Sequence, residues 1–304
     1  MQMSLSQWLL LIFLSILWGG TFFFVGVAVK ELPAFTLVLV RVAMAAAALT
    51  PIVLAMDLRF PASLGAWRPF LVMALLNNVI PFVLIVRGQR EIASGLASVL
   101  NATTPLWSVI LGHILTEEEK LKANRLAGVL VGIAGVAVLI GPETLLGSSA
   151  SVFGMLCVLG AAISYGFAGV WGRRFKGMSP LLCACCQLAC STLLLIPLAL
   201  IIDRPWGLAM PSPRTVWAVV GLALLSTALA YIVFFHIMAV SGPTNTMLVT
   251  LLIPVSAILF GTLLLDETML PRHIAGALVI GFSLLVIDGR LFGAHHRSET
   301  TSRP

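Results

Sequence analysis

The sequence predicts an all-α integral membrane protein with ten transmembrane helices arranged as two inverted five-helix repeats. Three observations predict this fold: the composition, the spacing of the apolar runs and a repeat within the chain. Of the 304 residues, 60% are hydrophobic and 10% are charged, and the mean hydropathy is +1.07. Because an average soluble domain carries about 25% charged residues, the composition excludes a soluble protein.

Ten apolar runs, separated by charged residues, are long enough to be transmembrane helices. A helix needs about 20 apolar residues to cross the hydrocarbon core of a bilayer. The expected spans are 7–29, 34–56, 69–86, 93–115, 125–141, 151–171, 180–202, 215–238, 244–265 and 272–288. The segments between them are too short for a water-soluble domain. No small-residue cleavage site follows the first run, so we expect a retained span rather than a signal peptide.

The distribution of basic residues predicts the orientation. Of the 18 Lys and Arg residues, eleven lie on one side of the expected spans and six on the other, with Arg41 inside the second span. The positive-inside rule places the richer side, together with both termini, in the cytoplasm, and the expected location is the cell inner membrane. The basic residues are scattered among the loops, so we expect the lipid bilayer but no nucleic acid as a partner.

A repeat covers most of the chain. The segment "PLWSVILGHILTEEEKL" from Pro105 matches "PVSAILFGTLLLDETML" from Pro254 at an offset of 149 residues, and both contain the pattern P-x6-G-x4-(D/E)E. Further upstream, Trp18 matches Tyr165 at an offset of 147 residues. The chain is therefore expected to be a duplication of a five-helix unit.

The expected units are residues 1–146 and residues 147–304, the second ending in a short cytoplasmic tail. Because five is odd, the second unit enters the membrane from the side opposite to the first. Inverted repeats of this kind place a binding site near the bilayer midplane and let it open alternately to each side. Channels and membrane enzymes can also be duplicated, so the repeat favours a transporter without proving one.

No chemical motif points to catalysis. The sequence contains no nucleophile elbow, no H-E-x-x-H zinc motif and no nucleotide-binding glycine loop. The five cysteines lie in apolar runs without a nearby histidine or carboxylate, so we interpret them as packing residues. We therefore expect no catalytic residue, no metal and no cofactor.

All twelve acidic residues fall in loops or at the ends of expected spans. A transporter of lipophilic cations usually has a carboxylate inside the membrane to pair the charge. The absence of one predicts a neutral or zwitterionic solute of mixed polarity. Such a solute needs flat apolar walls and a few amide or hydroxyl groups.

Candidate substrate-binding residues are the polar, aromatic and proline side chains in the middle of the spans. They are Trp18, Asn77, Asn78, Pro81, Asn101, Thr104, Trp107, Tyr165, Tyr231 and Thr250. For each polar group the alternative is a hydrogen bond to a neighbouring helix. Adjacent helical residues point about 100° apart, so Asn77 and Asn78 cannot both face the same helix, and we expect at least one of them to face a cavity.

Two prolines and one arginine are further candidates. Pro105 and Pro254 occupy matching mid-span positions, where a proline bends the helix and can form a hinge; the alternative is a static kink. Arg41 is the one charge well inside an apolar run. It either extends toward the interface, or bonds carbonyls of a neighbouring span, or binds a substrate carboxylate.

The sequence resembles a known family. The 5+5 repeat, "SILWGGTFF" in the first span, "LVRVAMAAAAL" in the second and the shared P-x6-G-x4-(D/E)E pattern resemble EamA-type members of the drug/metabolite transporter superfamily over residues 8–289. Overall similarity is closest to the YddG-type aromatic amino-acid exporters. The resemblance implies a monomeric exporter of small amphipathic metabolites, such as aromatic or other bulky neutral amino acids, that works by alternating access.

Three rival functions make different demands on the sequence. A transporter of nucleotide sugars or other polar metabolites needs more fixed charge facing a cavity. A cation multidrug pump needs a carboxylate inside the membrane, and a membrane enzyme needs a catalytic cluster. The direction of transport follows from the family resemblance alone.

Overall fold

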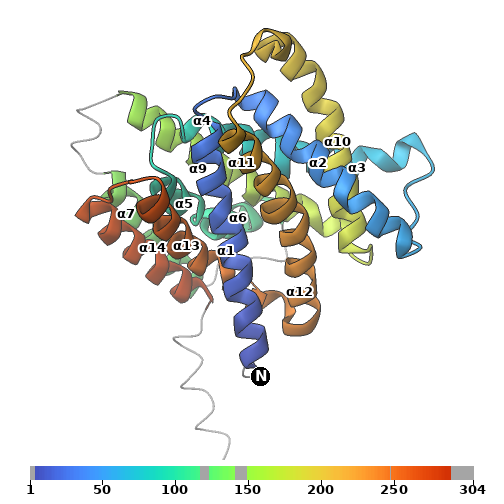
Figure 1. Cartoon of the computed structure of the whole chain (residues 1–304). Coiled ribbons are helices and arrows are strands. Elements are labelled where there is room, and N and C mark those ends of the chain that lie inside the picture. Colours follow the sequence, from blue (N-terminus) through green and yellow to red (C-terminus); the bar gives the residue numbers. More distant parts are fainter. Residues whose placement is uncertain (1–3, 117–122, 141–148, 247, 289–304) are drawn as a thin grey trace, which may run out of the picture.

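The computed structural model describes residues 4–116, 123–140, 149–246 and 248–288, and the regular elements in these ranges are all helical (Figure 1). The elements of the first half are α1 (Leu5–Ala28), α2 (Ala34–Ala55), α3 (Leu64–Ala74), η1 (Leu75–Val79), α4 (Ile80–Gly88), α5 (Ser94–Asn101), α6 (Thr104–Leu115) and α7 (Ala123–Ile140). Those of the second half are α9 (Ser149–Gly172), η2 (Arg173–Phe175), α10 (Pro180–Leu198), η3 (Ala199–Asp203), η4 (Pro205–Gly207), α11 (Pro213–Ala223), η5 (Leu224–Leu229), α12 (Ala230–Thr246), α13 (Val249–Leu264) and α14 (Pro271–Asp288).

Seven helical stretches in the described ranges are long and apolar enough to cross a membrane. They are Leu5–Ala28, Ala34–Ala55, Leu64–Gly88, Ser94–Leu115, Ser151–Phe175, Pro180–Asp203 and Pro213–Gly242. Three shorter apolar helices, Leu126–Ile140, Val249–Leu264 and Pro271–Ile287, fall where the fifth, ninth and tenth spans are expected. The chain is thus a multi-pass helical membrane protein, and its arrangement as ten inverted spans stays a prediction.

Two π-helical segments interrupt long helices at matching positions. The segment η1 joins α3 to α4, and η5 joins α11 to α12. Their first residues, Leu75 and Leu224, are separated by 149 residues, which is the offset of the sequence repeat. Single π-turns inside α-helices are frequent at functional sites, so these segments direct attention to the side chains they carry.

The predicted pair of proline hinges differs between the two halves. Pro105 lies in the first turn of α6, directly after a real break between α5 and α6. By contrast, α13 runs without interruption through Pro254. The helix is therefore not broken at Pro254, and the hinge expected at this proline stays a prediction. The second half bends before α13 instead, at Gly242, whose φ of 76° suits a residue without a Cβ.

The core consists of three apolar clusters. One lies between α2, α3, α10 and α11, the second between α4, α5, α9 and the α7–α14 pair, and the third between α1, α12 and α13. Figure 1 shows α7 and α14 side by side at the edge of the bundle, where Gly276 of α14 packs against the α7 backbone. Tyr165 of α9 contacts the first two clusters, so its side chain lies where they meet.

Candidate functional site

The two adjacent asparagines of η1 both bond to α10. Asn78 is fully buried, and its Nδ2 donates to Ser191 Oγ at 2.9 Å. Asn77 Nδ2 donates to Gln187 Oε1 at 3.1 Å. The prediction that they could not face the same helix is wrong, because it assumed an α-helix. In the wider π-turn adjacent side chains diverge less, and both reach α10 residues that are one helical turn apart.

The matching π-turn of the second half carries Thr227, which lies 149 residues after Asn78. Its hydroxyl donates to the Leu222 carbonyl at 2.8 Å and accepts from Arg41 Nε at 2.9 Å. Each π-turn therefore presents a polar side chain to a helix of the other half, η1 to α10 and η5 to α2.

Arg41 is held deep inside the bundle. Its side chain is only 4% exposed, and the guanidinium carbon lies 3.7 Å from the centre of the Phe82 ring. The hydroxyls of Tyr165 and Tyr231 lie close enough to interact electrostatically with it. Burial excludes the expected extension toward the interface, and the bonded group is a threonine hydroxyl rather than a backbone carbonyl. Arg41 was a further candidate from the sequence because it is a charge inside an apolar run, whereas Thr227, which holds its Nε, was not selected.

Aromatic rings continue from these polar groups toward α1. The Tyr231 hydroxyl donates to Asn78 Oδ1 at 3.4 Å, and its ring stacks on Phe235 at 6.0 Å between centroids. Phe235 packs on Phe234, which lies 5.2 Å from Trp18. We call the following residues the central cluster: Arg41, Asn77, Asn78, Tyr165, Thr227 and Tyr231. Trp18, Asn77, Tyr165 and Tyr231 remain partly accessible within the bundle.

The candidates on the fourth span lie apart from the central cluster. Thr104 Oγ1 donates to the Asn101 carbonyl at 2.7 Å, and Trp107 Nε1 donates to Thr103 Oγ1 at 3.2 Å. Their donors are thus occupied within their own turns. Asn101 Oδ1 is buried and has no hydrogen-bond donor in the described part of the chain. Trp107 packs against Gly166, the neighbour of Tyr165 in α9.

The other two candidates complete the comparison with the sequence. Pro81 is buried in the first turn of α4, directly after η1. Thr250 is partly buried in α13. The structure therefore brings together Trp18, Asn77, Asn78, Tyr165 and Tyr231, and it places Asn101, Thr104 and Thr250 on other helices.

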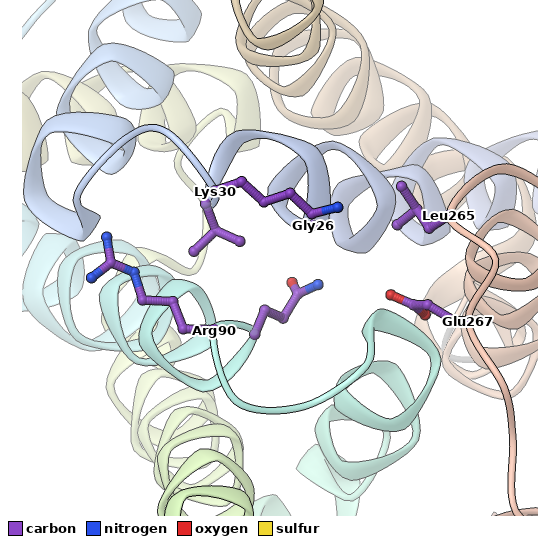
Figure 2. A pocket seen from close by; sticks show the side chains of 7 residues that line it. Gly26, Lys30, Arg90, Leu265 and Glu267 are labelled. Carbon is purple, nitrogen blue, oxygen red and sulfur yellow. The ribbon is translucent and has the colours of Figure 1, made fainter. Parts of the chain in front are cut away.

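A second site lies at the end of the bundle where α1 finishes. A cavity of about 250 Å³ is lined by Gly26, Val29, Lys30, Gln89, Arg90, Leu265 and Glu267. Figure 2 shows Lys30 and Arg90 on one side of it and Glu267 on the other. Gln89 Nε2 donates to the Phe22 carbonyl at 2.8 Å, whereas its Oε1 is buried without a donor in the described residues. Sequence reasoning did not predict this cavity.

Glu267, the last residue of the repeated pattern, caps a helix of the other half. Its carboxylate accepts from Ser94 N at 2.9 Å, from Ser94 Oγ at 2.6 Å and from Gly95 N at 3.3 Å, all at the start of α5. A carboxylate at a helix N-terminus satisfies free N–H groups and interacts favourably with the helix dipole. The pattern's Gly261 leaves room for this carboxylate, because a Cβ there would clash with Glu267 Oε2.

Two more carboxylates cap helices at the same end. Glu31 accepts from Ser212 N and Ser212 Oγ, both at 2.6 Å, and these bonds hold the pKa of Glu31 below its ordinary value. Asp203 accepts from Thr36 N at 2.7 Å and from Thr36 Oγ1 at 3.0 Å. We call these three contacts, Glu31–Ser212, Asp203–Thr36 and Glu267–Ser94, the capped end. Each joins a residue before 146 to a residue after 147.

The described residues contain no group of three or more His, Cys, Asp or Glu side chains placed to hold a metal ion. The described structure is a multi-pass helical bundle in which amides, hydroxyls and the Arg41 guanidinium lie buried between the helices. The protein is therefore of the class of polytopic membrane proteins with a polar site inside the membrane. The chain belongs to the EamA-like transporter family, whose model matches residues 6–141 and again 152–288. It is therefore a membrane transporter, and the family is one of transporters rather than enzymes.

Relatives support the same assignment. The chain is 26% identical to the uncharacterized transporter YoaV of Bacillus subtilis (strain 168), over 89% of this chain and 92% of the relative. It is 27% identical to the protein PecM of Dickeya dadantii (strain 3937), over 89% and 88%. It is 25% identical to the uncharacterized inner membrane transporter YedA of Escherichia coli (strain K12), over 92% and 90%.

One solved crystal structure has the same fold. It superposes with a TM-score of 0.65, covering 93% of this chain and 98% of the other, at 20% sequence identity. At that identity the likeness concerns the fold alone.

Proposed function

We propose that the protein is an exporter of small amphipathic metabolites, in particular aromatic and other bulky neutral amino acids, of the YddG type. One observation carries this proposal: the central cluster combines aromatic rings with amide and hydroxyl groups inside the bundle, and no described carboxylate belongs to it. Pockets for solutes of mixed polarity have this composition. A lipophilic cation would find no counter-charge there.

The proposed mechanism is alternating access by two inverted halves, residues 1–146 and 147–304, across ten transmembrane helices. The matching positions of η1 and η5 support this, because each bonds a helix of the opposite half close to the cluster. The capped end joins the halves by carboxylates at helix N-termini. In the proposed cycle these contacts break when this end opens, while the break between α5 and α6 acts as a hinge.

The proposal includes a location and a state of assembly. We place the protein in the cell inner membrane with both termini in the cytoplasm, acting as a monomer without a cofactor. The excess of basic residues on one side supports this orientation. The capped end then faces away from the cytoplasm, because α1 finishes there.

The test is counterflow in proteoliposomes made with the full-length protein. Liposomes loaded with unlabelled phenylalanine or tryptophan should accumulate the labelled amino acid transiently, and protein-free liposomes should not. The panel also contains labelled quaternary ammonium drugs and nucleotide sugars, with and without a pH gradient. Transport of drugs or nucleotide sugars but of no amino acid would refute the substrate assignment and favour the other polar metabolites or drugs of this superfamily.

A further inference from the structure

The charge of Arg41 is not balanced by the protein around it. A guanidinium stays ionised in proteins, and an ionised group inside a membrane is costly unless it is paired. Arg41 is 4% exposed, yet it forms no ion pair with a carboxylate in the described part of the chain. It contacts a threonine hydroxyl and the Phe82 ring, neither of which carries a charge.

The guanidinium is positioned but not saturated. Thr227 fixes Nε, and Phe82 covers one face of the planar group. The two terminal nitrogens donate to no described group, and neither is among the buried atoms that lack a partner. Each of them therefore keeps some accessible surface. Two parallel N–H donors on one edge of a guanidinium match the two oxygens of a carboxylate.

We propose that Arg41 binds the carboxylate of the transported solute, so that the substrates are aromatic or bulky monocarboxylates, amino acids among them. This inference rests on the proposed function and names the group that the central cluster recognises. A single guanidinium balances a single negative charge. The other cations near a described cavity, Lys30 and Arg90, lie at the capped end. The Tyr231 hydroxyl donates to Asn78 Oδ1, and the rings from Tyr231 to Trp18 provide an apolar wall for the side chain of the solute.

Binding measurements on the purified full-length protein in detergent test the proposal without requiring transport. Four matched probes separate the carboxylate from the amine: phenylalanine, phenylalanine amide, 3-phenylpropionate and 2-phenylethylamine. Wild-type protein should bind phenylalanine and 3-phenylpropionate and should bind the two probes without a carboxylate at least tenfold more weakly. This follows because a hydrogen bond to a charged group contributes about 1.5–3 kcal/mol, which is about a 10- to 150-fold change in affinity.

Variants assign the effect to Arg41. Arg41→Gln should lower the affinity for 3-phenylpropionate about 10- to 150-fold and abolish the preference for carboxylate probes. Arg41→Lys should retain part of this preference. Arg87→Gln removes the same charge from an exposed position of α4 and should bind like wild type. If Arg41→Gln does not fold, Thr227→Val keeps the charge, removes the Nε acceptor and should weaken only the probes that carry a carboxylate.

The outcomes distinguish this inference from the proposed function. If Arg41→Gln, or Thr227→Val in its place, binds 3-phenylpropionate as tightly as wild type, or if wild type prefers the amide, the inference is overturned. If wild type transports phenylalanine while Arg41→Gln transports it equally well, the inference fails and the proposed function stands. If binding depends on Arg41 but no amino acid is transported, the proposed function fails and the anion site stands.

Discussion

Replacing Glu267 with glutamine tests whether helix-terminal carboxylates hold the capped end together. Glu267 accepts three hydrogen bonds at the start of α5, and Ser94 beside it is only 1% exposed. Glutamine has no charge, and its side-chain NH2 group is a donor that faces one of the N–H or O–H donors of Ser94 and Gly95. The loss of charge assistance on two bonds and one unsatisfied donor together cost about 2–3 kcal/mol.

This cost applies to the state in which α13 and α5 are in contact. If that state alone contains the contact, Glu267→Gln shifts the equilibrium toward opening by about 30- to 150-fold, since about 1.4 kcal/mol corresponds to a factor of ten. A cysteine introduced at Val29, which lines the cavity and is 7% exposed, reports opening by its rate of reaction with a water-soluble maleimide. The rate is measured against the parent protein without this cysteine, because native cysteines are also present.

The neighbouring Asp266 provides the matched control. It is exposed and has a φ of 55°, a conformation that asparagine tolerates. Asp266→Asn removes the same charge one residue away without touching α5, so labelling at position 29 should stay at the parental rate. Equal labelling rates in Glu267→Gln and Asp266→Asn would refute the role assigned to the helix cap.

Three further predictions concern packing and pH. Asn78→Ala should lower the free energy of unfolding by about 1–3 kcal/mol in detergent, because it removes the hydrogen bonds of Asn78 to Ser191 and Tyr231 inside the bundle, and an unchanged thermal midpoint would contradict this. Gly19→Ala should cost about 1–3 kcal/mol because its Cβ would meet the α13 backbone at 2.9 Å, whereas Gly281→Ala meets nothing within 4 Å and should be neutral or slightly stabilising in the same assay. The bonds from Ser212 lower the Glu31 pKa below 4.5, so their stabilisation is complete above that pH and is lost as pH falls through the lowered pKa. A denaturation series should therefore show a deficit in Ser212→Ala that becomes smaller in acid, where only the loss of the N-cap bond from Thr215 N remains, and a deficit independent of pH would contradict the assignment.

The membrane-spanning helices could be predicted from the sequence because burial in lipid imposes a local requirement on composition and length. The run that forms α2 is apolar over its whole length, and no knowledge of its neighbours is needed to recognise it. The matching positions of Pro105 and Pro254 could also be read from the sequence. Whether either proline interrupts its helix could not. Whether a helix breaks at a proline depends on the packing of the surrounding turns, and α13 shows that it need not.

The site was harder to predict because it depends on which helices are neighbours. Tyr165 and Tyr231 could be selected as aromatic groups inside spans, and the structure brings both to the central cluster. The pairing of Asn77 and Asn78 with α10 required a π-turn, which has no recognisable signature in the residues themselves. Arg41 could be seen as unusual, but its position against Phe82 follows from tertiary contacts.

Counterflow of labelled phenylalanine through wild-type, Arg41→Gln and Arg87→Gln proteins tests most directly whether the central cluster is the solute site. Wild type and Arg87→Gln should show the same transient accumulation, and Arg41→Gln should lose most of it at substrate concentrations below the wild-type half-saturation. Equal accumulation by all three proteins would contradict the assignment of the central cluster as the solute site, and accumulation by none of them would contradict the proposed transport of aromatic amino acids.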